Sequence, residues 1–271
     1  MHELITDQSF DLNRTSEYIL SIQVSLDGFS FSIIDDNDNR LLMLYSSQAT
    51  ISTEKFIARR FDEWVNSEEI LSRQFAEVRV QYCTGNFTTV PESFFISEKQ
   101  NEIAALLFEQ EITSQVVTVH PKNTASKVLF SIPANFPSEI AEKFGSYSLE
   151  HPAAVLAEKG SSFFIEKEKG ALLYFTPKSF LLLLYSGKKL LLANSYNYSH
   201  PNDVVYYLMA ALNQYQIKPG DLKLILSGEI SSGDKTEMLL REYFSKTEFG
   251  SPETNYNPEI FKNIHRFINL L

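Results

Sequence analysis

The residue types that most often carry chemistry are few and scattered in this sequence. Its single cysteine, Cys83, ends an apolar run and is interpreted as a buried structural thiol, since one cysteine cannot form an internal disulfide. The five histidines have no short metal-ligand spacing. His151 and His200 each precede a proline at a predicted helix start, which favours a local structural role. We therefore predict no catalytic residue and no metal site.

The acidic run at residues 35–39 invites comparison with a calcium-binding loop. An EF-hand loop needs glycine at its sixth position and glutamate at its twelfth. Counting from Asp35, these positions hold Arg40 and Ser46, so we interpret the run as a solvated hairpin turn. The sequence also contains no G-x-S-x-G, Walker A or G-x-G-x-x-G motif, which excludes the best-known hydrolase and nucleotide-binding signatures.

Composition places the chain among ordinary globular proteins. It has 271 residues, 44% of them hydrophobic, which is enough for two domains with their own cores. The net charge of −10 and the scattered basic residues make nucleic acid a poor partner. The N-terminus lacks the features of a secretory signal, and the apolar runs at 180–185 and 190–193 are too short to span a bilayer. We expect a cytoplasmic protein.

Two stretches of the sequence, residues 18–85 and 170–228, predict the same order of elements. Each has three short apolar or alternating runs separated by turn residues, which indicates three antiparallel strands. An amphipathic helix pattern and a fourth strand follow, and the fourth strand ends at Gly85 in the first stretch and Gly228 in the second. The identity between the stretches is low, so the match is one of pattern. We predict a structural duplication.

The remaining segments are assigned by the same criteria. The charged stretch 166–170 is the best boundary candidate, giving domains 1–165 and 166–271. Residues 1–17 are interpreted as a lead-in. The other predicted elements are helices at 98–110, 138–144, 152–159, 234–244 and 258–270, and strands at 113–119, 126–132, 147–150 and 247–249. The last helix is expected to pack on its own domain.

This order of elements resembles the ribonuclease-H-like core, and two such copies resemble the actin-like ATPase fold. Residues 147–156 resemble the strand-to-helix step that precedes the second domain in actin-like pilus-assembly and type II secretion proteins. The whole sequence also resembles a bacterial family of the Bacteroides group that has this fold and no assigned function. The resemblance implies an α/β protein of duplicated ribonuclease-H-like domains. Its mixed sheets would begin with three antiparallel strands and carry helices on both faces.

The resemblance also implies where a nucleotide would bind. Actin-like ATPases hold phosphates and a metal ion between two hairpin turns, which need glycine for close approach and an aspartate to position Mg²⁺. In the first turn Ser25 stands where the acid is expected, and Asp27 and Gly28 are out of register.

The second turn and the adenosine side depart further from that pattern. The second turn, residues 175–179, contains neither acid nor glycine, and Pro177 removes one phosphate donor. The strand end that usually carries paired glycines has only Gly228, followed by Glu229. These departures argue against ordinary ATP hydrolysis.

We therefore predict a non-catalytic binding or scaffolding protein on a degenerate actin-like fold, without a cofactor, that holds a protein partner in the cleft or at a sheet edge. The alternative is a divergent nucleotide-binding protein or ATPase. In that case ATP and Mg²⁺ would bind in the cleft beside Asp27, Gly28, Gly85 and Gly228. A regulator or accessory factor with a small ligand fits the same observations.

Overall fold

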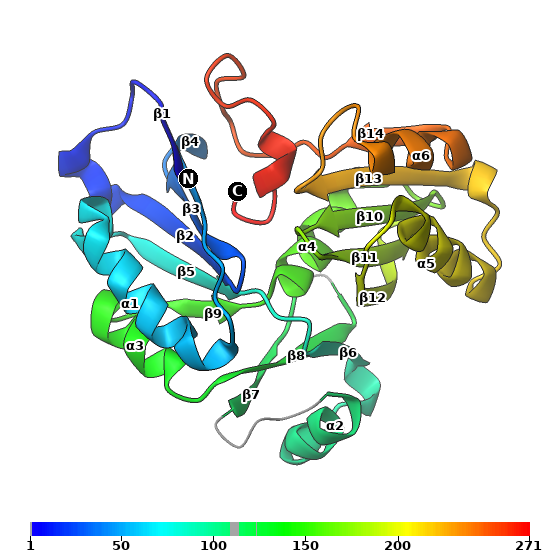
Figure 1. Cartoon of the computed structure of the whole chain (residues 1–271), viewed down its shortest axis with the longest axis horizontal. Coiled ribbons are helices and arrows are strands. Elements are labelled where there is room, and N and C mark those ends of the chain that lie inside the picture. The colour runs from blue at the N-terminus through cyan, green and yellow to red at the C-terminus, as the bar shows by residue number, and fades with distance from the viewer. Residues whose placement is uncertain (1, 109–113, 123) are drawn as a thin grey trace.

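The chain forms two mixed β-sheets with the same strand order. The computed structural model describes residues 2–108, 114–122 and 124–271 (Figure 1). The first sheet has the order β1-β4-β3-β2-β5-β9, and the second has the order β12-β11-β10-β13-β14. In both, a three-stranded antiparallel meander is followed by two parallel strands, and the first sheet has β1 as an additional antiparallel strand at its edge. The strands of these sheets are β1 (His2–Thr6), β2 (Tyr18–Ser25), β3 (Gly28–Asp35), β4 (Arg40–Gln48), β5 (Glu77–Tyr82), β9 (Ser148–Glu150), β10 (Lys169–Phe175), β11 (Ser179–Ser186), β12 (Lys189–Asn197), β13 (Leu222–Gly228) and β14 (Lys246–Phe249).

Helices cover the outer faces of both sheets, and one helix lies between the sheets (Figure 1). Helices α1 and α3 pack against each other on the first sheet, and α5 and α6 do so on the second. Helix α4 contacts β11 and β12 from the inner side. The duplicated α/β fold with helices on both faces of its sheets is thus confirmed. The helices are α1 (Ile57–Ser67), α2 (Gln100–Leu107), α3 (Phe136–Phe144), α4 (Pro152–Gly160), α5 (Pro201–Gln214) and α6 (Lys235–Tyr243).

The uninterrupted apolar run of β11 is explained by burial on both faces of the second sheet. Successive side chains of a strand point to opposite faces. Leu181, Leu183 and Tyr185 therefore join the core between the sheets. Their neighbours Leu182 and Leu184 join the core beneath α5 and α6. A strand buried on both sides shows no polar alternation, which is the pattern of this run.

A small module is inserted between β5 and α3. It consists of α2 and a three-stranded antiparallel sheet in the order β6-β8-β7, and it extends away from the two main sheets (Figure 1). Its strands are β6 (Phe87–Pro91), β7 (Ser114–Val119) and β8 (Ser126–Pro133). The sequence did not predict β6, whose Thr-rich five residues are held by pairing with β8 some forty positions later. The predicted helix 98–110 is shortened to α2, and residues 109–113 lie outside the described part.

The predicted lead-in at residues 1–17 is wrong, because it contains a strand. β1 pairs antiparallel with β4, with Leu4 opposite Tyr45. Four of the five β1 residues are exposed, so the strand is held by backbone pairing rather than by burial. A strand of this kind leaves no apolar alternation in the sequence.

The predicted C-terminal helix 258–270 is also wrong. Only a short 3-10 turn at Ile264–Phe267 is helical, and Asn263 before it has φ 54°, a left-handed conformation that interrupts a helix. The apolar residues expected to pack on their own half do so only in part. The turn Ile264–Phe267 contacts β13 of the second sheet, while Phe261, Ile264 and Phe267 also pack with residues of β3 and β4 in the first.

Residues 263–271, the C-terminal segment, connect the two sheets, and Figure 1 shows this segment between them. On the first sheet, Ser32 Oγ donates to the Leu270 carbonyl at 2.6 Å and Gln81 Nε2 donates to the Asn269 carbonyl at 2.7 Å. On the second sheet, Ser227 Oγ donates to the His265 carbonyl at 2.5 Å. The segment therefore contacts both halves, although the predicted domain division assigns it to the second. That division, at residues 165 and 166, falls in the connection before β10 and stays a prediction.

Among the residues that the structure describes, no helix is both long enough and apolar enough to cross a lipid bilayer.

Replacing Asn269 should weaken this connection. Asn269 Nδ2 donates to Gln23 Oε1 at 2.6 Å and to Gln81 Oε1 at 3.0 Å. In Asn269→Ala the Gln81 oxygen loses this partner in a buried site, so we expect the free energy of unfolding to fall by about 2–3 kcal/mol. Urea denaturation measures the change. Asn202→Ala, an exposed asparagine on α5, is the control, and an equal loss in both variants would contradict the proposed connection.

Candidate functional site

Two hairpin turns, one from each half, line a common cavity of about 220 Å³. The β2–β3 turn contributes Asp27 and Gly28, and the β10–β11 turn contributes Thr176 and Pro177. Three residues of the C-terminal segment, Arg266, Phe267 and Leu270, also line it. We call this space the cleft cavity. Its position between the two turns is the one that the sequence predicted for the candidate site.

The first turn is held by bonds to the chain that follows β4. The amide of Ala49 donates to the Asp27 carbonyl at 3.0 Å, and the amide of Ile51 donates to the Leu26 carbonyl at 2.9 Å. At Gly28 a Cβ atom would lie 2.0 Å from the Ser47 carbonyl oxygen, so only glycine fits. The glycine is therefore required by this contact with β4, whatever else the turn binds.

In the second turn most backbone donors are used internally. The Thr176 amide donates to the Ser179 carbonyl at 2.8 Å, and the Ser179 amide donates to Thr176 Oγ1 at 3.1 Å. Pro177 has no N–H group. A phosphate cradle needs several backbone N–H groups that converge on the ligand. In this turn two of the donors are directed at the turn itself and a third is absent.

The two predicted glycines outside the turns occupy different environments. Gly85 lines the cleft cavity, and a Cβ atom built on it would meet nothing within 4 Å. Gly228 is buried with φ 79°, and its Cβ would lie 2.2 Å from the Phe175 carbonyl oxygen. Asp27, Gly28 and Gly85 are thus brought together at the cavity. Gly228 is not among its lining residues, although its neighbour Glu229 is.

Acidic groups outnumber basic ones around the cleft cavity. Asp27, Glu54 and Glu229 line it with one guanidinium, that of Arg266. Both Arg266 contacts to Glu229, at 2.8 and 2.9 Å, come from the same nitrogen, Nη2. Because this guanidinium is already paired, the charge at the cavity is unfavourable for a polyphosphate without a metal ion.

The fold agrees with the comparisons to known proteins. The model of the family described as "Protein of unknown function (DUF3822)" matches residues 7–247. The chain belongs to the DUF3822 family. No curated protein matches it in sequence.

Two solved structures support the actin-like fold of this DUF3822 chain. A Bacteroides thetaiotaomicron protein with an actin-like ATPase fold and unknown function superposes with a TM-score of 0.81 at 20% identity, covering 91% of this chain and 95% of that one. A structure of the PilM–PilN type IV pilus biogenesis complex gives a TM-score of 0.61 at 14% identity, covering 94% and 97%. The predicted resemblance to a Bacteroides-group family with this fold, and to actin-like pilus proteins, is confirmed.

His151 fixes the junction between the cleft cavity and α4. Its Nδ1 accepts from the Ala153 amide at 3.0 Å as the helix N-cap, so Nε2 carries the proton and donates to the Thr84 carbonyl at 2.9 Å. The ring is fully buried, and burial lowers its pKa to about 4. The neutral imidazole is a structural group, as its position before a proline indicated.

Cys83, at the end of β5, lines the same cavity. Burial, together with the negative charge of Asp27, raises the pKa of its thiol to about 12. The sulfur is therefore protonated at neutral pH, which makes it a poor nucleophile. Within the described residues, no group of three or more His, Cys, Asp or Glu side chains is placed to hold a metal ion.

Sequence reasoning missed the contribution of the C-terminal segment to this site. Arg266, Phe267 and Leu270 lie more than 80 positions beyond the second turn. The spacing of the apolar residues in 258–270 matched a helix, and nothing in the local sequence indicated that this segment lies at the cleft.

Replacing Gly228 by alanine should destabilise the protein irrespective of ligand. The new Cβ would overlap the Phe175 backbone and require a strained φ, so we expect a loss of about 3 kcal/mol in the free energy of unfolding. Gly85→Ala, at an open position of the cavity, is the matched control and should change little. Urea denaturation distinguishes them, and equal stability of the two variants would show that Gly228 has no such structural role.

The buried His151 predicts a pH-dependent stability. Its ordinary pKa is 6.5, and burial lowers it to about 4 in the folded state, so between these values only the unfolded state takes up the proton. Lowering the pH through this window should therefore reduce the free energy of unfolding, by about 3 kcal/mol in total. His151→Asn keeps an N-cap acceptor that does not titrate. In this variant the free energy of unfolding should depend less steeply on pH, by the equivalent of up to one bound proton.

The matched control is His200→Asn, which changes the exposed N-cap of α5 and should retain the wild-type slope. Denaturation at a series of pH values between 4 and 7.5 gives both slopes. Burial also lowers the pKa of His265, so part of the dependence should remain in His151→Asn. An unaltered slope in His151→Asn would refute the assignment.

Proposed function

We propose that the protein is a non-catalytic binding protein that uses the actin-like fold without hydrolysing nucleotide. The observation that supports this most directly is the second hairpin turn, where the Thr176 and Ser179 amides are bonded within the turn and Pro177 has none. Phosphoryl transfer depends on positioning phosphates and a metal ion. A turn with inward-directed donors, facing a cavity with three carboxylates, is poorly suited to that task.

The partner in this proposal is another protein, and the inserted module is the surface proposed to bind it. Four large apolar side chains of the module are exposed within fourteen positions, and Leu106 is 85% exposed. Single exposed apolar side chains are normal, whereas a contiguous apolar patch usually marks an interaction site, and the proposal is that these four side chains form such a patch. The apolar residues are Phe94, Ile96, Leu106 and Leu107.

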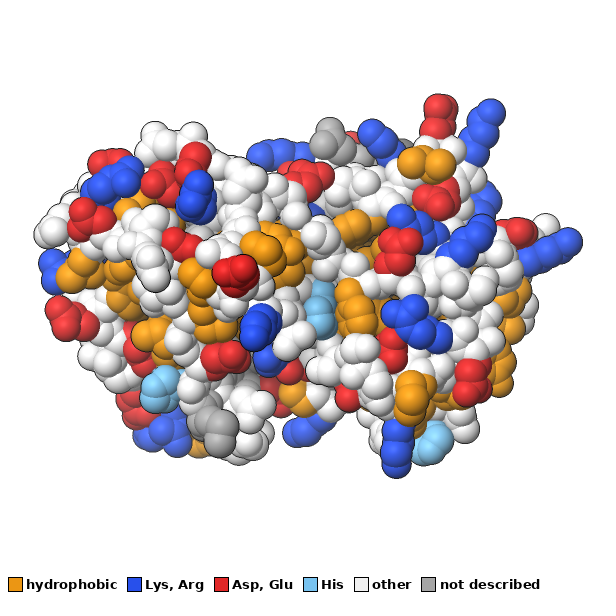
Figure 2. All heavy atoms as spheres, turned by 90° about the horizontal axis from the view of Figure 1, so that it is seen from above, with side chains coloured by type: hydrophobic (Ala, Val, Ile, Leu, Met, Phe, Trp, Pro, Cys, Tyr) orange, Lys and Arg blue, Asp and Glu red, His pale blue; other side chains and the backbone are white. Residues whose placement is uncertain are grey.

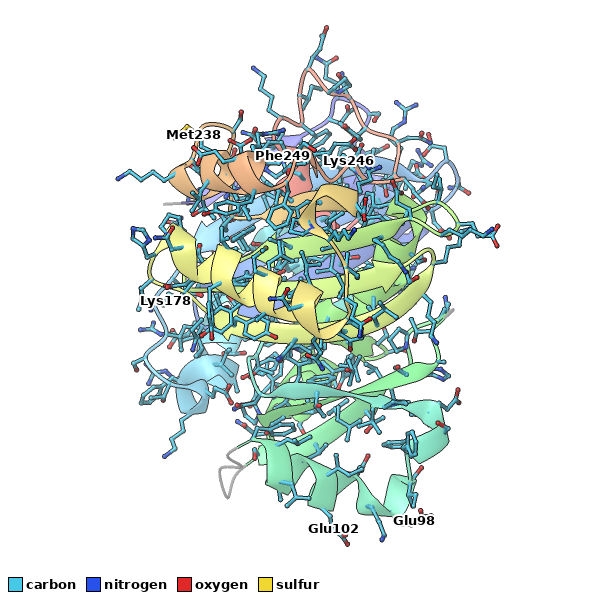
Figure 3. All side chains as sticks on the ribbon, turned by 90° about the vertical axis from the view of Figure 1, so that its right-hand side faces the viewer. Glu98, Glu102, Lys178, Met238, Lys246 and Phe249 are labelled. Carbon is cyan, nitrogen blue, oxygen red and sulfur yellow. The ribbon has the colours of Figure 1, made fainter. Side chains whose placement is uncertain are left out.

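Acidic residues accompany these apolar groups. Glu92, Glu98 and Glu102 are exposed on the same module, with the exposed Lys99 among them, and Figure 3 shows Glu102 of α2 and Glu98 of the turn before it at the outer end of the module. By contrast, basic and acidic side chains are interspersed on the face of the molecule shown in Figure 2. The composition of the module fits a partner segment that combines apolar side chains with lysine or arginine.

The PilM–PilN complex supports a protein partner by analogy, since a neighbour with this fold is found there with another protein. At 14% identity, that similarity supports only the shared fold. A protein partner for this chain is part of the proposal. A cytoplasmic location belongs to the same proposal.

The alternative, a divergent nucleotide-binding protein, is favoured by one observation. Asp27, Gly28 and Gly85 lie around one cavity between the two halves, where the fold places the nucleotide of an actin-like ATPase. In that case Asp27 would position Mg²⁺, and the open space at Gly85 would admit the ligand.

A nucleotide titration separates the two functions. The thermal midpoint is followed with ATP or ADP at millimolar concentration, each with Mg²⁺. A ligand at 100 times its dissociation constant adds about 2.7 kcal/mol to stability, which a melting curve resolves. The proposal expects no shift. An upward shift that disappears in Asp27→Ala would replace it with the nucleotide-binding alternative.

Two double variants test the proposed partner surface. A protein captured by the wild-type chain should be lost by the double variant Phe94→Ser, Leu106→Ser, whose thermal midpoint should stay close to that of the wild type because both positions are exposed. The matched control is Ile165→Ser with Tyr206→Ser, two exposed apolar positions outside the module. Capture that is equally strong in both double variants would exclude the module as the binding surface.

A further inference from the structure

A second cavity, of about 250 Å³, lies at the β9 edge of the first sheet. Strands β5 and β9, helix α4, the turn at residues 119–122 and the end of the C-terminal segment enclose it. We call it the sheet-edge cavity. Its volume is below the range of about 300–1,000 Å³ that is typical of pockets for drug-sized ligands, so a molecule of fewer atoms fits it. None of its features enters the function proposed above.

Two buried polar atoms at this cavity have no hydrogen-bond partner among the described residues, Ser148 Oγ and Asn269 Oδ1. Asn269 is only 2% exposed, and its Nδ2 is committed to Gln23 and Gln81. The Oδ1 atom is therefore the part of this amide without a partner, and as a carbonyl oxygen it can only accept a hydrogen bond. A buried acceptor without a donor is costly, so such atoms usually indicate a bound water or ligand.

Three cationic residues, Arg79, Lys122 and Lys159, line the same space, and the proposal concerns Arg79 and Lys159. The guanidinium of Arg79 is bound by Glu77 through two contacts of 2.8 Å, which leaves donors on its other edges. The ammonium of Lys159 forms no hydrogen bond or salt bridge within the described part of the chain. Burial, with a smaller contribution from Arg79, lowers the pKa of Lys159 to about 8. The carboxyl groups of Glu150, Glu158 and Glu253 also act on this ammonium and raise its pKa, but none of them forms a salt bridge with it in the described part of the chain.

The acidic groups of the cavity do not serve as a close counter-ion for Lys159. Glu150 also lines it, but burial raises the pKa of its carboxyl group. Glu158 Oε2 accepts from the Lys122 amide at 3.0 Å. The cavity thus combines the ammonium of Lys159 and the remaining donors of Arg79 with a neutral acceptor, Asn269 Oδ1, and the Ser148 hydroxyl, neither of which has a partner in the described residues.

We propose that the sheet-edge cavity binds a small hydroxylated anion, whose anionic group pairs with Lys159 and Arg79 and whose hydroxyl donates to Asn269 Oδ1. Ser148 Oγ completes the site as a donor to the anion or an acceptor from a second hydroxyl. A carboxylate and a phosphate monoester share the required chemistry. A simple anion lacks the donor that Asn269 needs, and a neutral polyol lacks the charge that Lys159 needs.

Calorimetric titration of the full chain with matched pairs of probes tests the site. Glycerate is compared with propionate, and glycerol 3-phosphate with propyl phosphate, so that each pair differs in its hydroxyl groups. We expect one hydroxylated probe to bind at least tenfold more tightly than its match, and the pair that does so identifies the anion as carboxylate or phosphate. Binding of neither hydroxylated probe up to 10 mM, or equal binding within both pairs, would overturn the proposal.

Variants locate the binding within the chain. Lys159→Met removes the charge but keeps an apolar stem, and we expect it to weaken binding of the preferred probe at least tenfold. Lys188→Met, an exposed lysine in the β11–β12 turn, is the matched control and should bind as the wild type does. Equal affinity in Lys159→Met and Lys188→Met would show that the probe binds elsewhere and would overturn the assignment.

A second measurement avoids substitution altogether. Carbon-13 labelling of the lysine side chains allows the Lys159 ammonium to be titrated by NMR in the folded wild-type protein. A bound anion stabilises the ammonium, so saturation with the preferred probe should raise the pKa of Lys159 from its value near 8. A pKa that is unchanged at saturation would place the anion away from Lys159 and contradict the proposal.

Discussion

The structure depends on one set of hydrogen bonds, those between the C-terminal segment and the polar side chains that face it from both sheets. A sheet face that is buried would normally be apolar, yet the inner face of the first sheet carries Ser32 and Gln81. These side chains can be buried because backbone carbonyls of the segment accept their hydrogens. Ser227 has the same role in the second sheet. Without the segment, these buried side chains of both sheets would lose their hydrogen-bond acceptors. The stability of each half therefore depends on the same segment.

This arrangement also determines what the cleft can contain. In the cleft cavity, Phe267 and Leu270 supply apolar surface, and Arg266 is paired with Glu229. The Tyr174 hydroxyl donates to Gln23 Oε1 at 2.9 Å, and the same oxygen accepts from Asn269. A polar network therefore crosses from one half to the other beneath the cavity. The two halves of this actin-like fold are thus joined by side-chain hydrogen bonds.

The duplicated fold was predictable because its elements have strong local patterns. The alternation of Phe29, Phe31 and Ile33 with serines is a strand signal, and the run at 180–185 has the composition of a strand buried on both faces. Proline at the start of α4 and α5 located both helices correctly. These signals depend on residues within a few positions of one another, which is why they survive low similarity between the halves.

The parts that could not be predicted are those held by distant partners. β1 and β6 are short strands stabilised by pairing with β4 and β8, and neither has a distinct apolar periodicity of its own. The C-terminal segment has the apolar spacing of a helix, but its carbonyls bond to side chains as many as 238 positions earlier. The lining of the cleft cavity followed the same rule: Asp27, Gly28 and Gly85 stand at a turn and a strand end that local patterns predict, whereas no local pattern indicated Arg266.

The C-terminal segment has a consequence for how the chain reaches its native state. Three residues of the first sheet are buried by residues more than 200 positions later. They are Ile34, Leu41 and Leu44, which pack against Phe261, Phe267 and Leu270, so strands β3 and β4 are covered only after residues 261–270 have been made. During synthesis the first half can form its sheet and its α1–α3 face once β9 (Ser148–Glu150) has been made, but its inner face stays uncovered until residues 261–271 follow. Contacts of such long sequence separation slow the final step of folding, because the entropy of closing the loop is lost before they form. The first half alone would therefore expose an apolar and polar face until residues 261–271 pack against it.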